Sequence, residues 1–295
     1  MSPSAQPRFN KYRYMKLRIF LKISLFLLTS SLYAGGPWPA GKGHGYLKLS
    51  QRAIVANSFF NLNGKIIPIT TTGLFTTSVY GEYGLSERFT LRANVPVFFR
   101  ATLNEVRYEP SGHIEPGDQL NSLGDIDLGF SYAIIRNKPF VLGVTVQAGI
   151  PTGNPAGGAT GLLQSGDGEF NQLVKIDAGY SFYPKPFYIS GSAGINNRTR
   201  GFSEEAHLQV EAGATFAKKF LIILKTSTVR SFKNGDAPLA MTGIFSNNTQ
   251  YLSFGPEINY LPRPNIGISA GVYGAAASAN ILAAPSLDLG FFLKW

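Results

Sequence analysis

The chain has 295 residues, of which 44% are hydrophobic, 13% are aromatic and only 15% are charged. An ordinary soluble protein carries about 25% charged residues, so this low charge, together with 33 glycines, favours an all-β protein with tight turns and an apolar outer surface. The absence of cysteine excludes disulfides, thiolate catalysis and cysteine-type zinc sites.

The net charge of +10 is concentrated at the amino terminus. Residues 1–34 hold six of the 27 bases and no acid, which leaves 21 bases against 17 acids in the rest of the chain. A surplus this small and dispersed does not indicate binding to nucleic acid, so no nucleic-acid partner is expected.

The first predicted element is an amino-terminal extension followed by a secretory signal peptide, together residues 1–34, with the start of translation at Met15. Bases precede a short apolar run at 23–28, and a small, polar exit leads to a cleavage site near Ala34. A membrane anchor is disfavoured because the apolar stretch is too short and is interrupted by Lys22. We therefore expect export.

Downstream of Gly35, no apolar stretch approaches the roughly 18–20 residues that a spanning helix needs. Instead, about a dozen segments show the period-two alternation of strands. They cover residues 43–55, 72–83, 87–99, 124–135, 139–150, 171–183, 186–197, 205–217, 219–230, 248–260, 264–275 and 285–295.

Short and long links between these segments alternate without a break. The long links are 56–71, 100–123, 151–170, 198–204, 231–247 and 276–284. Clipped periplasmic turns and longer outer loops are the signature of a transmembrane β-barrel. A soluble sandwich has no reason to sort its links in this way.

Each predicted strand has one apolar and one charged face. A soluble sheet of this size would need a second apolar layer, and no helix is available to supply it. In lipid, the apolar face looks outward, and closure satisfies every backbone group. The other face supplies the candidate lumen-lining residues, namely Lys48, Arg52, Glu82, Arg88, Arg92, Asp125, Asp127, Lys175, Asp177, Arg198, His207, Glu211, Lys225, Glu257, Asp288 and Lys294.

The predicted fold is therefore all-β: a closed, antiparallel, up-and-down transmembrane β-barrel of about 12 strands over residues 43–295. A short periplasmic segment, residues 35–42, precedes it. The expected location is the outer membrane of a Gram-negative cell, with outer-membrane lipid as a partner.

The chain ends in SLDLGFFLKW, which looks like the terminal-strand signal of outer-membrane proteins. Asp288, Gly290, Leu293 and Trp295 supply its pattern of a polar residue, glycine, spaced hydrophobes and a final aromatic residue. This strand is expected to pair with the first one and to be presented to the barrel-assembly machinery.

Three short motifs carry a family resemblance: GDIDLG at 124–129, IPTG at 150–153 and GDG at 166–168. On these motifs, the chain resembles outer-membrane proteins of the phenol meta-pathway family, which are transporter-like barrels. The resemblance covers most of the mature chain. It implies a route for small hydrophobic or aromatic compounds, and it places no binding residue on this sequence.

The lumen candidates comprise eight bases and seven acids, besides one histidine. A selective ion pore favours rings of one sign, whereas near balance predicts ion pairs across the lumen that narrow the passage. Barrels of 8 strands are filled by side chains, and barrels of about 16–18 are open porins. We therefore predict a narrow, passive channel for a small-molecule solute that is hydrophobic or aromatic.

Two apolar features are expected to serve this channel. A plug under the lumen is predicted at residues 36–39, Gly-Pro-Trp-Pro. A capture surface at the mouth is predicted from the loop residues Ile66, Ile67, Leu162, Leu163, Ile281 and Leu282.

The alternatives are a structural or surface-interaction barrel that transports nothing and, less favoured, an outer-membrane lipid hydrolase. His207 has no serine in a recognisable motif near it, so no enzyme activity and no catalytic residue are expected. Oxygen ligands for Ca²⁺ are plentiful at Asp118, Asp125, Asp167 and Glu169, but EF-hand spacing is absent, so neither a metal nor another cofactor is expected.

Overall fold

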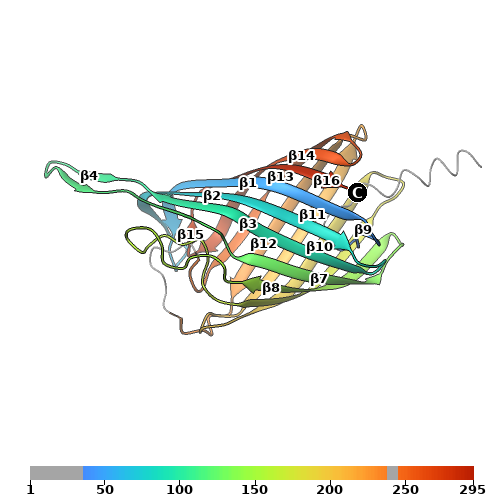
Figure 1. Cartoon of the computed structure of the whole chain (residues 1–295), viewed down its shortest axis with the longest axis horizontal. Coiled ribbons are helices and arrows are strands. Elements are labelled where there is room, and N and C mark those ends of the chain that lie inside the picture. Colours follow the sequence, from blue (N-terminus) through green and yellow to red (C-terminus); the bar gives the residue numbers. More distant parts are fainter. Residues whose placement is uncertain (1–35, 238–244) are drawn as a thin grey trace, which may run out of the picture. The chain divides into compact units, whose positions relative to one another are not determined.

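The structure is a computed structural model that describes residues 36–237 and 245–295. It is a closed antiparallel β-barrel whose strands run obliquely along the wall (Figure 1). The predicted signal peptide lies outside the described residues. The twelve long strands are β1 (Gly45–Phe60), β2 (Ile66–Gly84), β3 (Phe89–Leu103), β7 (Ile126–Ile135), β8 (Phe140–Ile150), β9 (Asn171–Ser181), β10 (Phe187–Arg198), β11 (Glu205–Phe216), β12 (Phe220–Ser231), β13 (Gln250–Arg263), β14 (Ile266–Ala279) and β16 (Ser286–Lys294).

Each long strand pairs with its neighbour along the chain, and β1 closes the barrel by pairing with both β2 and β16. The closing register places Lys48 opposite Phe292 and Arg52 opposite Asp288. Each of the twelve long strands thus has a partner on both sides, which is what hydrocarbon demands of a spanning sheet. The predicted twelve-stranded antiparallel barrel is confirmed.

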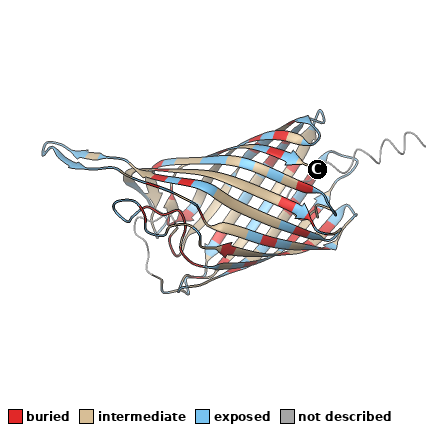
Figure 2. Ribbon diagram, viewed as in Figure 1, coloured by how far each residue is buried: buried red, intermediate tan, exposed pale blue. Residues whose placement is uncertain are grey.

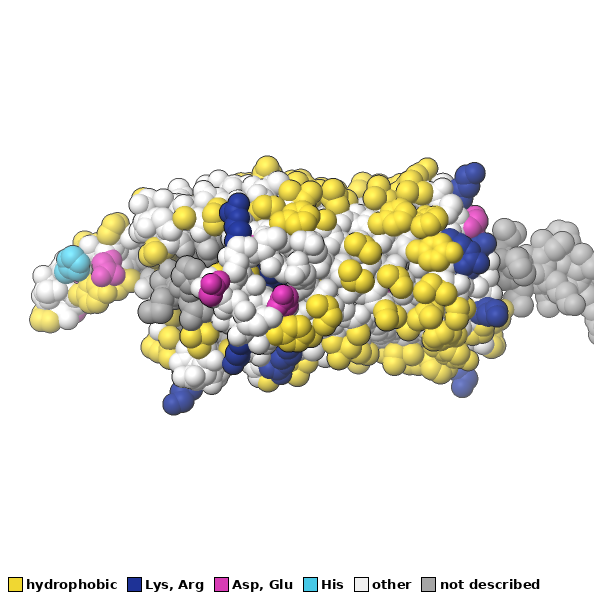
Figure 3. Space-filling model, turned by 90° about the horizontal axis from the view of Figure 1, so that it is seen from below, with side chains coloured by type: hydrophobic (Ala, Val, Ile, Leu, Met, Phe, Trp, Pro, Cys, Tyr) yellow, Lys and Arg dark blue, Asp and Glu magenta, His cyan; other side chains and the backbone are white. Residues whose placement is uncertain are grey.

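Side chains alternate between the two faces of the wall, apart from irregularities in four of the strand pairs. Leu289, Leu224 and Ile176 point outward and are 63%, 62% and 59% exposed, whereas the neighbouring Asp288 points inward and is 6% exposed. Buried and exposed bands alternate along the strands in Figure 2. In Figure 3, the outward side chains form an apolar band around the middle of the barrel. Soluble monomers rarely expose an apolar surface of this extent.

The described residues contain no helix long and apolar enough to cross a bilayer.

Two predicted long links are wrong, because the strands there continue. The β1–β2 ladder runs on through Ser58 opposite Pro68 to Phe60 opposite Ile66, so the predicted loop 56–71 shrinks to Asn61–Lys65. Pro68 donates no ladder hydrogen bond, and it lies beside an irregularity in the ladder.

The other wrong link is 276–284. There, β14 extends to Ala279, and a short strand, β15 (Ile281–Leu282), pairs with Phe59 and Phe60 of β1.

The link after β3 has structure of its own. It holds a small hairpin of β4 (Val106–Tyr108) and β5 (His113–Glu115), followed by β6 (Asp118–Ser122), which pairs with the end of β3. The wall is uneven as a result: β2 has 19 residues and β7 has 10. The loop at 151–170 connects β8 and β9, which have only 11 residues each.

Candidate functional site: the barrel interior

Glu257 on β13 is the centre of an interior cluster near the barrel seam. Its Oε2 lies 2.8 Å from Lys225 Nζ and 3.8 Å from Lys48 Nζ. Tyr273 donates its hydroxyl to Oε2 at 2.9 Å, and Asn259 donates an amide to Oε1 at 3.0 Å. Because Glu257 is only 6% exposed, these partners replace the water that its charge has lost.

Asp288 on β16 completes this seam cluster from the last strand. It accepts a hydrogen bond from Arg52 Nη2 at 3.3 Å and lies 3.6 Å from Lys48 Nζ. Both bases belong to β1, so these ion pairs join the first and last strands of the barrel. The interior charge therefore reinforces the closing ladder.

A second cluster lies on β2 and β3. Arg92 Nε is 3.3 Å from the buried Glu82, which also accepts the hydroxyl of Tyr80. Arg92 donates its Nη2 to the backbone oxygen of Gly36 at 2.5 Å. One guanidinium thus joins an interior carboxylate to the segment that precedes the barrel.

Other predicted interior acids are held by neutral groups. Thr145 donates to Asp177 at 2.5 Å, and Asn94 donates to Asp127 at 3.4 Å. Glu211 accepts the hydroxyl of Tyr188 at 3.1 Å. These contacts again join neighbouring or nearby strands and brace the wall.

The third cluster has Arg198, at the end of β10, as its centre. Its guanidinium nitrogens lie 2.8 Å from Asp167, 2.7 Å from Glu169 and 2.8 Å from Glu205. It also stacks on the Phe202 ring, 4.5 Å from the centroid. The Arg198 side chain is 6% exposed and those of the acids are 0–10% exposed, so three carboxylates share one buried cation.

Burial raises the pKa of Glu169, and the charge of Arg198 opposes that rise. Glu169 belongs to the loop at 151–170, outside the strands, so Arg198 fixes this loop to the wall. Asp125 assists by accepting the backbone N–H of Gly153 and of Asp167, at 2.8 and 3.0 Å.

The same loop is anchored on its outer side by Asp118. This carboxylate accepts two hydrogen bonds from Thr160, one from its hydroxyl and one from its backbone, and a third from the backbone of Ala159. These donors lower the pKa of Asp118 to about 2. Asp118, Asp125, Asp167 and Glu169 are thus engaged with protein donors or with Arg198.

The predicted capture surface is wrong for two of its members. Leu163 is 6% exposed and packs with Phe99 and Leu120 inside the long-loop end, and Leu282 is 9% exposed. Ile66 and Ile67 are exposed but lie on strand β2 rather than in a loop. These residues do not share one exposed face. Some lie on strands, and Leu163 is buried because the loop at 151–170 folds inward.

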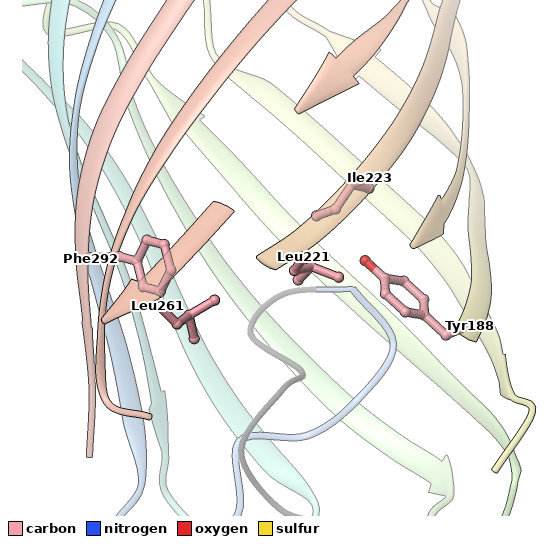
Figure 4. Packing of buried hydrophobic residues seen from close by; sticks show 5 residues of the cluster. All are labelled: Tyr188, Leu221, Ile223, Leu261 and Phe292. Atoms are coloured by element: carbon pink, nitrogen blue, oxygen red, sulfur yellow. The ribbon is translucent and has the colours of Figure 1, made fainter. Parts of the chain in front are cut away.

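An apolar collar lines the interior at the opposite, short-turn end. It consists of Tyr188, Leu221, Ile223, Leu261 and Phe292, all 8% exposed or less. Figure 4 shows these side chains projecting into the same interior space from β10, β12, β13 and β16. Trp38 and Tyr46 pack against the collar, and the Trp38 ring meets Tyr188 edge-on at 5.4 Å.

Residues 36–40 cross the interior at this end, beneath the collar in Figure 4. Gly36 is held by Arg92 of β3, and the Ala40 N–H donates to Thr90 of the same strand at 3.1 Å. On the far side, Trp38 reaches β9, where a Cβ on Gly179 would lie 2.8 Å from its ring. The segment therefore occupies the short-turn end of the lumen, where the sequence predicted a plug.

The remaining lumen candidates divide into interior and rim positions. Arg88 precedes β3 and donates to the carbonyls of Ala133 and Ile134, so it caps the rim. Lys175 lies on the inward face of β9, and Lys294 Nζ lies 5.5 Å above the Phe292 ring. His207 pairs with Glu205 at 3.0 Å.

Most interior ion pairs form between adjacent strands rather than across the lumen. Lys225–Glu257 and Arg198–Glu205 join neighbouring strands of the sheet. Among the described residues, only the Lys48–Glu257 pair passes over two intervening strands. The sequence predicted charged residues of both signs on the interior face but could not predict which of them meet. It also missed the roles of Asp167 and Glu169, which lie in the predicted link 151–170, and of Tyr188, which lies on the predicted strand 186–197.

The family whose model matches this chain is described as "Putative MetA-pathway of phenol degradation", and it matches residues 61–284. The chain belongs to this family. No curated protein matches it.

Solved structures agree on the fold. The chain is similar to an outer-membrane channel from Pseudomonas putida F1, with 13% identity, a TM-score of 0.66, and coverage of 90% of this chain and 100% of that one. It is also similar to the translocator domain of the autotransporter NalP from Neisseria meningitidis, with 10% identity, a TM-score of 0.51, and coverage of 96% and 98%. This member of the phenol-degradation family therefore has the fold of outer-membrane barrels.

Proposed function

We propose that this protein is a gated, passive channel of the outer membrane for small, weakly polar molecules, aromatic ones included. The observation that carries the proposal is the apolar collar at one end of a lumen that is otherwise lined by charges, with Trp38 packed into it. The family description and the channel title of the similar Pseudomonas barrel support it. The outward apolar band supports insertion in a membrane.

The chemistry of the interior favours weakly polar solutes over ions. Several interior carboxylates and bases are ion-paired, and the described part of the interior carries charges of both signs, whereas a selective ion pore favours a ring of one sign. An apolar collar offers few polar groups to replace the hydration shell of an ion. An apolar solute binds there favourably because its apolar surface is removed from water. Trp38 already shows that an indole-sized ring fits there.

The segment that carries Trp38 closes this end, so passage requires it to move. Its contacts include two hydrogen bonds to β3, the aromatic contact with Tyr188 and packing of Trp38 against the collar. Each such hydrogen bond is worth about 0.5–1.5 kcal/mol, or up to about 3 when one partner is charged. Opening of the channel breaks these contacts.

Planar-bilayer recording of the purified protein tests the proposal. We expect W38A and G179V, which remove or displace the ring, to conduct more than the wild type. Tyr183→Ala, which removes an exposed aromatic ring at the same end, is the matched control and should not change conductance. Phenol should block the W38A current, and glycerol at the same concentration should not.

Two outcomes count against the proposal. Absence of conductance in both the wild type and W38A would favour the alternative, a sealed barrel that presents its loops to a partner. Conductance that phenol and glycerol block equally would remove the weakly polar solute class.

A further inference from the structure

The two ends of the barrel differ in charge. The short-turn end is formed by residues 41–44, 85–88, 136–139, 182–186, 217–219 and 263–265. Its exposed bases are Lys42, Arg88, Lys138, Lys185, Lys218, Lys219 and Arg263. The same segments hold one acid, Glu87, and it is paired with an eighth base, Arg136, at 3.0 Å.

The long-loop end lacks this bias. Among the described residues, the six exposed bases of this end are balanced by as many acids, and Arg107 pairs with Glu105 at 2.7 Å. The bases are Lys65, Arg100, Arg107, Arg200, Arg230 and Lys233, and the acids are Glu105, Glu109, Glu115, Asp118, Glu204 and Asp236. In Figure 3, Lys and Arg side chains mark the short-turn end, and the Lys and Arg side chains toward the long-loop end lie among Asp and Glu. The basic belt, as we name the seven exposed bases of the short turns, is therefore a property of one end alone.

Exposed aromatic rings lie directly beside the belt on the outward face. They include Phe140, Phe187, Phe216, Phe220 and Trp295, which are 38–55% exposed. Rings of this kind mark the interface between hydrocarbon and headgroups.

The chain order then fixes the depth of the bases. Lys218 and Lys219 lie between Phe216 and Phe220, and Lys138 is two residues before Phe140. A strand advances about 3.3 Å per residue, so these ammonium groups lie within a few ångströms of the ring level, at the depth of lipid phosphates.

We propose that the basic belt binds the phosphate groups of anionic phospholipids in the leaflet that surrounds the short turns. The belt encircles the barrel, so several headgroups can be bound at once, each by bases of one or two turns. The inference requires membrane insertion in the predicted orientation, and it is independent of channel activity.

The test is a titration of the purified full-length barrel in neutral detergent with short-chain phosphatidylglycerol, followed by the fluorescence of Trp295, which is 55% exposed at this end. Phosphatidylcholine is the matched neutral lipid. We expect phosphatidylglycerol to bind more tightly, and K138Q/K185Q/K218Q/K219Q to lose affinity on the order of fivefold for each base removed. Salt at about 0.5 M should weaken the binding, because it screens charge.

The control removes as many bases from the other end, in K65Q/R107Q/R230Q/K233Q, and it should bind phosphatidylglycerol like the wild type. A Lys→Arg version of the belt variant should also bind normally, which separates charge from folding. Equal binding of the two lipids, equal losses in belt and control variants, or an equal response to inorganic phosphate would each overturn the proposal. W38A conductance is unaffected by this outcome, so the two proposals can fail separately.

Discussion

Replacement of Arg198 by methionine tests the reasoning about the interior most directly. Methionine keeps much of the volume of the side chain and removes its charge. Three carboxylates, from Asp167, Glu169 and Glu205, then lose the one cation that lies within 2.8 Å of each. Their side chains are 10%, 0% and 9% exposed, so water cannot replace the lost partner.

Removal of one member of a buried ion pair destabilises a protein by about 3–5 kcal/mol, because the other charge stays buried without compensation. Three carboxylates place R198M at the upper part of that range at pH 7. A second substitution that removes one of the buried charges, as in R198M/E169Q, should recover part of the loss. A double-mutant cycle measures that recovery.

The loss should depend on pH. Burial already raises the pKa of Glu169 in the folded barrel, and loss of Arg198 raises that pKa further. A carboxyl whose pKa is raised by folding stabilises the fold at low pH, and this contribution is lost as pH rises through the folded-state value. The deficit of R198M should therefore shrink between pH 7 and pH 5 by about 1.4 kcal/mol for each unit of further rise.

Urea unfolding of the barrel in lipid vesicles, followed by tryptophan fluorescence, supplies the free energies. Arg100→Met is the matched control, because Arg100 is exposed and makes one side-chain hydrogen bond, to Gln119 at 3.2 Å. It should change stability by no more than about 0.5 kcal/mol. A loss below about 1 kcal/mol in R198M, or a loss that does not change with pH, would falsify the assignment of Arg198 as the shared counterion.

Three further substitutions test other parts of the structure. Leu289→Arg puts a charge on the lipid face midway along β16 and should cost about 2–4 kcal/mol in vesicles, whereas L289M should cost little. Glu257→Gln leaves Lys225 without its carboxylate and Lys48 with Asp288 alone, and it should lower stability by about 3 kcal/mol in the same assay; a wild-type value would contradict the seam cluster. Asp118→Asn weakens the hydrogen bonds that hold Thr160, so limited proteolysis at pH 7 should cut the loop at 155–161 faster than in the wild type. In the wild type, the pKa of Asp118 is about 2, so the loop should stay protected until the pH falls below about 3.8 toward that value. Equal cutting of both proteins at pH 7 would contradict the anchor.

The strands of the barrel wall could be predicted from the sequence because apolar and polar residues alternate with a period of two in a strand that faces lipid on one side. Leu287, Leu289 and Phe291 alternate with Asp288 and Gly290, and the structure keeps that division of faces. The short turns were predicted where this alternation stops. The ends of β1, β2 and β14 were misplaced because polar and proline residues there still pair with a neighbouring strand.

For the interior, the sequence predicted which residues face inward but not which of them contact one another. Parity puts Lys48, Glu257 and Asp288 inside, but which of them meet depends on the stagger between strands that are far apart in the chain. The loop acids Asp167 and Glu169 carry no periodic signal, and they meet Arg198 only because their loop folds inward. The plug was predictable because Trp38 is a large apolar residue just before the first strand.

The pairing of Asp288 with two bases of β1 bears on the order in which the chain assembles. The carboxylate belongs to the last strand and Lys48 and Arg52 to the first, so neither ion pair exists until the two ends of the sheet meet. An open sheet that entered the bilayer would bring these charges into hydrocarbon without partners. The cost of burying these unpaired charges thus opposes insertion of the open sheet. Closure of the barrel pairs the charges and removes them from contact with hydrocarbon.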